Sequence, residues 1–137
     1  MNKSFLHQQK KPDLCGSTQK RNFMDQQSIH INIALDNQKM PEHIDWHASG
    51  TENGDLPQHA KAFLLSLWDG KEKAALRIDL WTKKMMVDEM NDFFFQTLMT
   101  LADTYARATK NEALGKEMKT FAEDFRKKAE AALEKEN

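Results

Sequence analysis

Apolar and polar residues alternate over two short stretches between residues 29 and 48. In the first stretch the apolar positions fall two apart, at Ile29, Ile31, Ile33 and Leu35. In the second they fall at Ile44, Trp46 and Ala48. A period of two is typical of a strand with one buried face. The polar residues 36–39 between them supply turn chemistry, so the pattern predicts a β-hairpin.

Residues 60–68 fit two templates. Their apolar positions recur at helical spacing, at Ala60, Phe63, Leu64, Leu67 and Trp68. The same residues also make a short apolar run, followed by five polar residues, 69–73, of a suitable length for a hairpin loop. A clear alternating strand then follows at residues 76–81. We favour a strand over residues 60–68, preceded by a helical turn over residues 57–61, and keep a helix as the alternative.

Two apolar stripes at helical spacing occupy the last third of the chain. The first comprises Met86, Met90, Phe93, Phe94, Leu98, Leu101, Ala102 and Tyr105. The second comprises Leu114, Met118, Phe121, Ala122, Phe125, Ala129 and Leu133. Between them, Thr109 and Glu112 have the spacing of a capping box. The stripes predict two helices packed as an antiparallel pair.

The order of these elements predicts an α+β fold, in which a mainly antiparallel four-stranded sheet is followed by two C-terminal α-helices packed on one face of it. We expect a single domain over residues 28–137. Residues 1–27 are expected to be a disordered basic tail, because residues 1–23 carry five basic side chains against one acidic one. As an alternative, the natural protein begins at Met24 rather than at Met1.

Composition limits the classes of function. The chain has 137 residues, 30% charged and 39% hydrophobic, with a net charge of −1, which is typical of one soluble domain. No apolar run is long enough for a membrane span, so we expect no direct membrane insertion. Beyond the tail the chain is net acidic, which argues against nucleic acid as a partner. The single cysteine, Cys15, forms no internal disulfide, and we expect a cytoplasmic protein.

Two sets of polar residues invite a chemical interpretation, and we favour neither. His43, Asp45 and His47 alternate on one strand, but residues four apart on a strand lie about 13 Å apart, too far for one metal ion. Asp79 and Asp88 could form an acid–base pair, but an alternating strand and a first helical turn each explain an Asp. We therefore expect no metal, no cofactor, no catalytic residues and no enzyme activity.

The surplus of apolar residues is the stronger lead. If helices cover one face of the sheet, large side chains on the other face must meet water or a partner. The candidate interaction residues are Phe63, Leu65, Leu67, Trp68 and Trp81. Exposed apolar patches of this kind usually mark an interface, so we expect self-association, as a dimer or higher oligomer, or docking of another protein. The alternative is that the loop of residues 49–57 or the tail covers this face.

Several runs resemble the gliding motility-associated protein GldC family. They are Leu65–Asp69 (LSLWD), Leu76–Lys83 (LRIDLWTK), Val87–Met90 (VDEM), Phe94–Leu98 (FFQTL) and Leu101–Tyr105 (LADTY). The resemblance extends over residues 29–127. It implies a non-enzymatic, cytoplasmic accessory protein of bacterial gliding, whose partner is a protein of the gliding or linked secretion machinery. The alternative function is a chaperone or adaptor for unfolded export clients, because strands followed by two helices are also the layout of the SecB chaperone.

Overall fold

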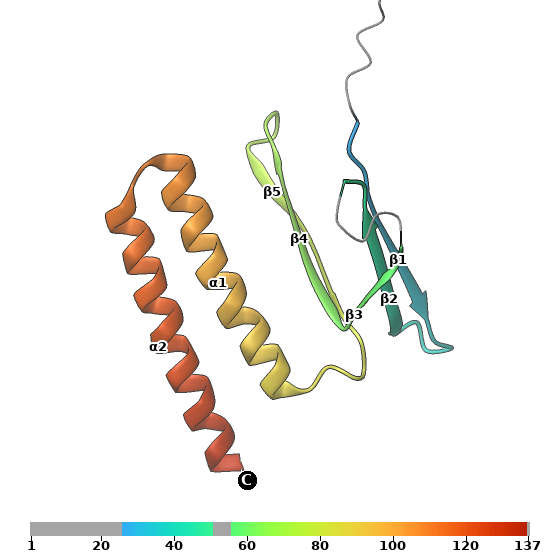
Figure 1. The fold of residues 1–137 in the computed structure, drawn as a ribbon. Helices are drawn as coiled ribbons and strands as arrows, with labels where there is room; N and C mark the ends of the chain where they lie inside the picture. The colour runs from blue at the N-terminus through green and yellow to red at the C-terminus, as the bar shows by residue number, and fades with distance from the viewer. Residues whose placement is uncertain (1–25, 51–55, 137) are drawn as a thin grey trace, which may run out of the picture.

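The computed structural model describes residues 26–50 and 56–136, arranged as five strands followed by two helices (Figure 1). The strands are β1 (Ile29–Leu35), β2 (Pro41–Ala48), β3 (Gln58–Ala60), β4 (Ala62–Asp69) and β5 (Ala74–Trp81). The helices are α1 (Val87–Thr109) and α2 (Glu112–Glu136). Apart from residues 26 and 27, the predicted tail lies outside the described residues, as do Met24 and the centre of the predicted loop, residues 51–55.

The strands form two antiparallel sheets, so the predicted single four-stranded sheet is wrong. One sheet has the order β1-β2-β3, and the other pairs β4 with β5. β3 and β4 follow each other directly and are separated only by Lys61, where the chain bends. The β2–β3 ladder stops at Ile44 opposite Ala60. The bend at Lys61 then turns β4 away from this ladder, and β4 pairs with β5 instead.

Residues 62–69 form a strand, which rejects the helical alternative for this segment. The predicted helical turn over residues 57–61 is also wrong, because residues 58–60 are β3. Each residue of β4 has a cross-strand partner in β5, from Ala62 opposite Trp81 to Asp69 opposite Ala74. In the connecting turn, Asp69 Oδ1 accepts the backbone N–H groups of Lys71 at 2.8 Å and of Glu72 at 3.1 Å. These bonds lower the pKa of Asp69 and close the predicted polar loop.

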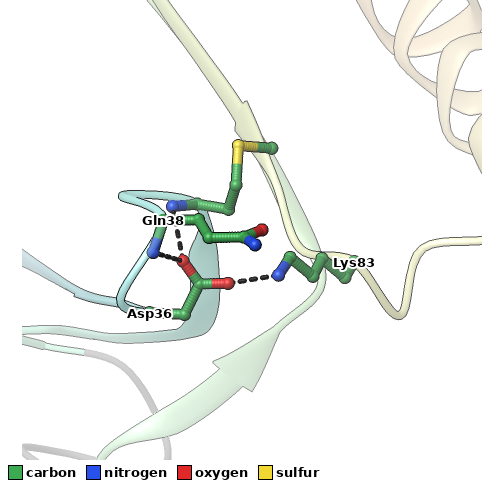
Figure 2. A network of polar contacts seen from close by, with 4 residues as sticks. Asp36, Gln38 and Lys83 are labelled. Atoms are coloured by element: carbon green, nitrogen blue, oxygen red, sulfur yellow. Dashed lines mark hydrogen bonds and ion pairs between the residues drawn. The ribbon is translucent and has the colours of Figure 1, made fainter.

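The turn between β1 and β2 contains a second carboxylate that organises the backbone. Asp36 Oδ1 accepts the N–H groups of Gln38 at 2.8 Å and of Met40 at 3.0 Å. Its Oδ2 forms an ion pair with Nζ of Lys83, which lies in the connection between β5 and α1 (Figure 2). The pKa of Asp36 is lowered, chiefly by the hydrogen bond from Lys83 and next by that from Met40. One side chain therefore fixes the turn and ties it to a distant segment.

The two helices form an antiparallel pair, as predicted (Figure 1). Their connection differs in detail, because Asn111 rather than Thr109 caps α2. The side-chain Oδ1 of Asn111 accepts the N–H of Leu114 at 3.1 Å. Thr109 belongs to α1, and its hydroxyl donates to the carbonyl of Tyr105 at 2.8 Å. Lys110 has a left-handed φ of 59°, which ends α1.

Small residues form the contact between the helices. Ala102 and Ala122 are 0% exposed, and the ideal Cβ of an alanine at Gly115 would lie 2.7 Å from Ala106 Cβ. Some larger residues of the predicted stripes lie outside this contact, since Leu101 is 51% and Phe121 61% exposed, whereas Tyr105, Met118 and Phe125 are half-buried. The close approach of the helices therefore leaves much of their large apolar surface uncovered.

The helix pair meets the strands through α1. Figure 1 shows α1 between α2 and the β4–β5 hairpin, so α1 rather than α2 lies next to the strands. An ion pair between Lys61 Nζ and Glu89 Oε1 joins the bend between β3 and β4 to the first turn of α1. Glu89 also accepts the backbone N–H of Met86 at 3.0 Å. Both contacts lower the pKa of Glu89, that from Lys61 the more.

Candidate interaction surface

The β4–β5 hairpin has two faces of different character. Residues directly opposite each other in an antiparallel pair share a face, and successive residues alternate. The register therefore places six large apolar residues on what we call the apolar face: Phe63, Leu65, Leu67, Leu76, Ile78 and Leu80. The other, mixed face carries Ala62, Leu64, Ser66, Trp68, Ala75, Arg77, Asp79 and Trp81.

All five residues expected to form the interaction surface lie on this hairpin, but on different faces. Phe63, Leu65 and Leu67 belong to the apolar face, whereas Trp68 and Trp81 belong to the mixed face. Phe63 and Leu65 are half-buried, while Leu67, Trp68 and Trp81 are 55%, 69% and 52% exposed. The three exposed residues are therefore split between the faces.

Two further exposed residues on the apolar face were missed by the sequence reasoning. Leu76 is 54% and Ile78 53% exposed. The sequence predicts the strand in which they lie, but the candidate interaction residues do not include them. The register with β4 adds them to the same surface as Leu67, and this pairing is what the sequence does not display.

Exposure on the apolar face increases from the root of the hairpin to its tip. At the root, Phe63 and Leu80 lie beside Met90 and Phe93 of α1, and these residues help to line a cavity of about 360 Å³. Farther along, Leu67 and Leu76 lie opposite each other and are each more than half exposed. The tip therefore offers apolar surface that α1 does not cover.

The mixed face of the hairpin also carries two charged side chains, Arg77 and Asp79. Arg77 Nε donates a hydrogen bond to Asp79 Oδ1 at 3.2 Å, along the same strand. The Arg77 side chain is 69% exposed and that of Asp79 is 39% exposed. A pair this accessible contributes little to stability, but it leaves one positive and one negative group available to a partner.

The described histidines lie on the other sheet. The rings of His30 and His47 stack with their centroids 4.7 Å apart, and His59 Nδ1 is hydrogen-bonded to Asp45 Oδ1. Within the described residues, no group of three or more His, Cys, Asp or Glu side chains is placed to hold a metal ion.

The two aspartates considered as an acid–base pair lie in different surroundings. Asp79 lines the cavity at the hairpin root and bonds to Arg77. Asp88 lines a separate hollow between α1 and α2, together with Asp92 and Arg126. The geometry therefore gives this pair no shared site at which to exchange a proton with a substrate.

The helices also bear on the question of membranes. In the part of the chain that the structure describes, none of the helices combines the length and the apolar character needed to cross a bilayer.

Comparison with known proteins gives one match. The sequence model of a family described as "Gliding motility-associated protein GldC-like" matches residues 41–131, from the start of β2 into α2. No curated protein and no solved structure matches the chain. The match covers more than half of the chain, includes the whole β4–β5 hairpin and agrees with the resemblance found in the sequence. The chain belongs to the GldC-like family of gliding motility-associated proteins.

Proposed function

We propose that this protein is a non-enzymatic, cytoplasmic accessory component of bacterial gliding, and that it acts by binding a protein partner through the β4–β5 hairpin. The partner is a second copy of the chain or a protein of the gliding or linked secretion machinery. Family membership associates the chain with gliding motility. The proposed mode of action rests on the exposed apolar side chains of the β4–β5 hairpin.

A single observation carries the proposal: large apolar side chains gather exposed on one hairpin. Leu67, Trp68, Leu76, Ile78 and Trp81 are each between 52% and 69% exposed. Scattered apolar residues are normal on a protein surface, but Leu67, Leu76 and Ile78 are neighbours on the apolar face, and an exposed apolar group usually marks a contact site. Aromatic residues are also enriched where proteins bind one another, and the mixed face of the same hairpin holds Trp68 and Trp81.

The chemistry available on the hairpin favours binding over catalysis. Among its charged residues, Arg77 and Asp79 bond to each other and Asp69 bonds to the turn backbone, and the cavity at its root is lined mainly by apolar side chains. Such a surface offers burial of apolar area rather than a nucleophile or a proton donor.

Deletion of the gene in a gliding host tests the proposal. Colony spreading should fall while growth in liquid culture stays normal, and the wild-type gene should restore spreading. Unchanged spreading in the deletion strain would reject the role in gliding. A strain that regains spreading with a chain carrying polar residues at Leu67 and Trp68 would reject the hairpin as the contact.

The competing function is a chaperone for unfolded export clients. The exposed apolar hairpin favours it too, since holding an unfolded chain requires accessible apolar surface. The two functions differ in selectivity. A chaperone should suppress the aggregation of unrelated unfolded proteins, whereas a dedicated component should leave them to aggregate and retrieve one defined partner from lysate.

A further inference from the structure

We propose that two copies of this chain join edge to edge through β5, antiparallel and centred on Ile78, so that the two hairpins form one four-stranded sheet. This inference rests on the proposed function, because it names the partner of the same hairpin. It follows from three features of β5: a free backbone edge, a self-complementary sequence and exposed apolar neighbours.

The first feature is the free edge. Within the described residues, β5 pairs with β4 alone. The N–H of Thr82 donates to the carbonyl of Lys61 at 2.7 Å, and in an antiparallel ladder the residues bonded to the partner strand alternate. The even-numbered residues of β5 therefore bond to β4. The backbone groups of Ala75, Arg77, Asp79 and Trp81 point outward, and an edge strand of eight residues with these groups free can pair with another chain.

The second feature is the sequence of β5 itself. Residues 75–81 read Ala-Leu-Arg-Ile-Asp-Leu-Trp, which is nearly symmetric about Ile78. In an antiparallel pair centred there, Arg77 lies opposite the second copy's Asp79, and Asp79 lies opposite its Arg77. Leu76 likewise meets Leu80 of the second copy. Opposite charges directly across a pair of strands are favourable, and here the two-fold symmetry produces two such pairs.

The backbone selects the same register. When the pair is centred on Ile78, each residue whose backbone groups point away from β4 lies opposite another such residue, so the inter-strand hydrogen bonds can form. After a shift by one residue, each of these residues would lie opposite one whose backbone groups already bond to β4, and the hydrogen bonds could not form. A shift by two would centre the pair on Arg77 or on Asp79, which places like charges face to face. The edge of β4 is also open, but its only charged residue is the terminal Asp69, so it offers no comparable pairing.

The third feature is the surface that pairing would cover. Leu76, Ile78 and Trp81 flank the edge and are 54%, 53% and 52% exposed. Pairing along a strand of eight residues, about 27 Å long, would cover part of each of these side chains. The apolar faces of both hairpins would become one continuous surface.

Reversal of the charges tests the pairing. Arg77→Asp and Asp79→Arg each place like charges opposite each other at both symmetric positions. Each variant alone should raise the dimer dissociation constant by about tenfold to a hundredfold in sedimentation equilibrium. An equimolar mixture of the two should dimerise again, because the acidic pair of one variant meets the basic pair of the other. The bond between Arg77 and Asp79 within one chain is absent from both variants, so its loss cannot explain the recovery.

A disulfide tests the register. In a Cys15→Ser background, Ile78→Cys puts two thiols directly opposite each other in a non-hydrogen-bonded pair, with Cα atoms about 4.5 Å apart, a distance that a disulfide spans. Leu76→Cys is the matched control, because the two copies of this residue lie four residues apart across the pair, about 13 Å. Mild oxidation should give covalent dimers of the first variant and no covalent dimers of the second.

The outcomes separate this inference from the proposed function. A wild-type chain that stays monomeric over a concentration series rejects the β5 pair, as does a dimer that crosslinks through Leu76→Cys but not through Ile78→Cys. A monomer that retrieves another protein through the hairpin also rejects the pair, yet it leaves the function in gliding standing. If the variants behave as expected while the deletion strain spreads normally, the pair stands and the function fails.

Discussion

Lys83 and Asp36 are 47 positions apart in sequence and form an ion pair that joins the β5–α1 connection to the turn between β1 and β2 (Figure 2). Within the described residues, the backbone passes directly from one sheet to the other at Lys61, between β3 and β4. The ion pair adds a non-covalent link between the β1–β2 turn and the segment that follows β5. It therefore limits how the β1–β2–β3 sheet can turn relative to the segment that leads into α1.

Substitutions at Asp36 should separate its two roles. Asp36→Ala removes both the acceptor for the turn N–H groups and the partner of Lys83, whereas Asp36→Asn keeps a side-chain oxygen for the turn. Lys83→Met removes the ion pair alone. We expect Asp36→Ala to lower Tm the most, with the other two close to wild type, because exposed ion pairs contribute little. Thermal unfolding followed by circular dichroism measures the order, and an Asp36→Asn loss equal to that of Asp36→Ala would contradict it.

Stability should fall in mildly acidic solution. The pKa values of Asp36 and Asp69 lie below their ordinary value of 3.8, and that of Glu89 lies below 4.5. A carboxylate with a lowered pKa in the folded state stabilises the protein above its unfolded pKa, and this contribution is lost as the pH falls through the folded value. Urea midpoints should be flat near neutral pH and decline below about pH 4.5. A variant combining Asp36→Asn with Glu89→Gln should decline less steeply, and an equal decline would refute the assignment.

Local signals in the sequence were sufficient for four of the five described strands, for the two hairpin turns and for both helices, but not for β3, which was expected as a helical turn. The two-residue period predicted β1 at residues 29–35, and the polar run after Trp68 predicted the turn that Asp69 closes. For residues 60–68, length and the following loop favoured the strand correctly over the helical spacing of Phe63 and Leu67. These features depend on neighbours along the chain, which a sequence displays directly.

Features that depend on distant residues were not predictable in the same way. The break into two sheets lies at Lys61, between β3 and β4, and it shows only in how the strands pair. The packing of the helices through Gly115 and Ala106 gave no signal in a search for large apolar stripes. For the same reason the exposure of Leu76 and Ile78 was missed, while the apolar surplus around Trp68 was predicted from the number of large apolar residues on two faces of one sheet.

The helix contact at Gly115 should not accept a larger residue. Gly115→Ala gains helix propensity of about 1 kcal/mol, but overpacking costs about 1–3 kcal/mol. The new Cβ would meet Ala106 Cβ at 2.7 Å and the backbone oxygen of Ala102 at 3.3 Å, so we expect net destabilisation. In an Ala106→Gly background the same substitution should cost less, because the nearest atom is gone. A double-mutant cycle in urea measures this coupling, and purely additive effects would contradict the close contact.

The tip of the hairpin should matter for binding more than for folding. Leu67 and Trp68 are 55% and 69% exposed, so replacing both by threonine, which keeps β propensity, should change the free energy of unfolding by no more than about 1 kcal/mol. Retrieval of the partner from lysate, or affinity for it once identified, should fall by at least about tenfold, because large apolar and aromatic anchors dominate interfaces. Phe121→Gln on α2 is the matched control, since Phe121 is 61% exposed and lies away from the hairpin. If Phe121→Gln lost as much partner binding as the hairpin variant, the contact would lie on the helices. If the hairpin variant kept full partner binding, the hairpin tip would not belong to the binding surface.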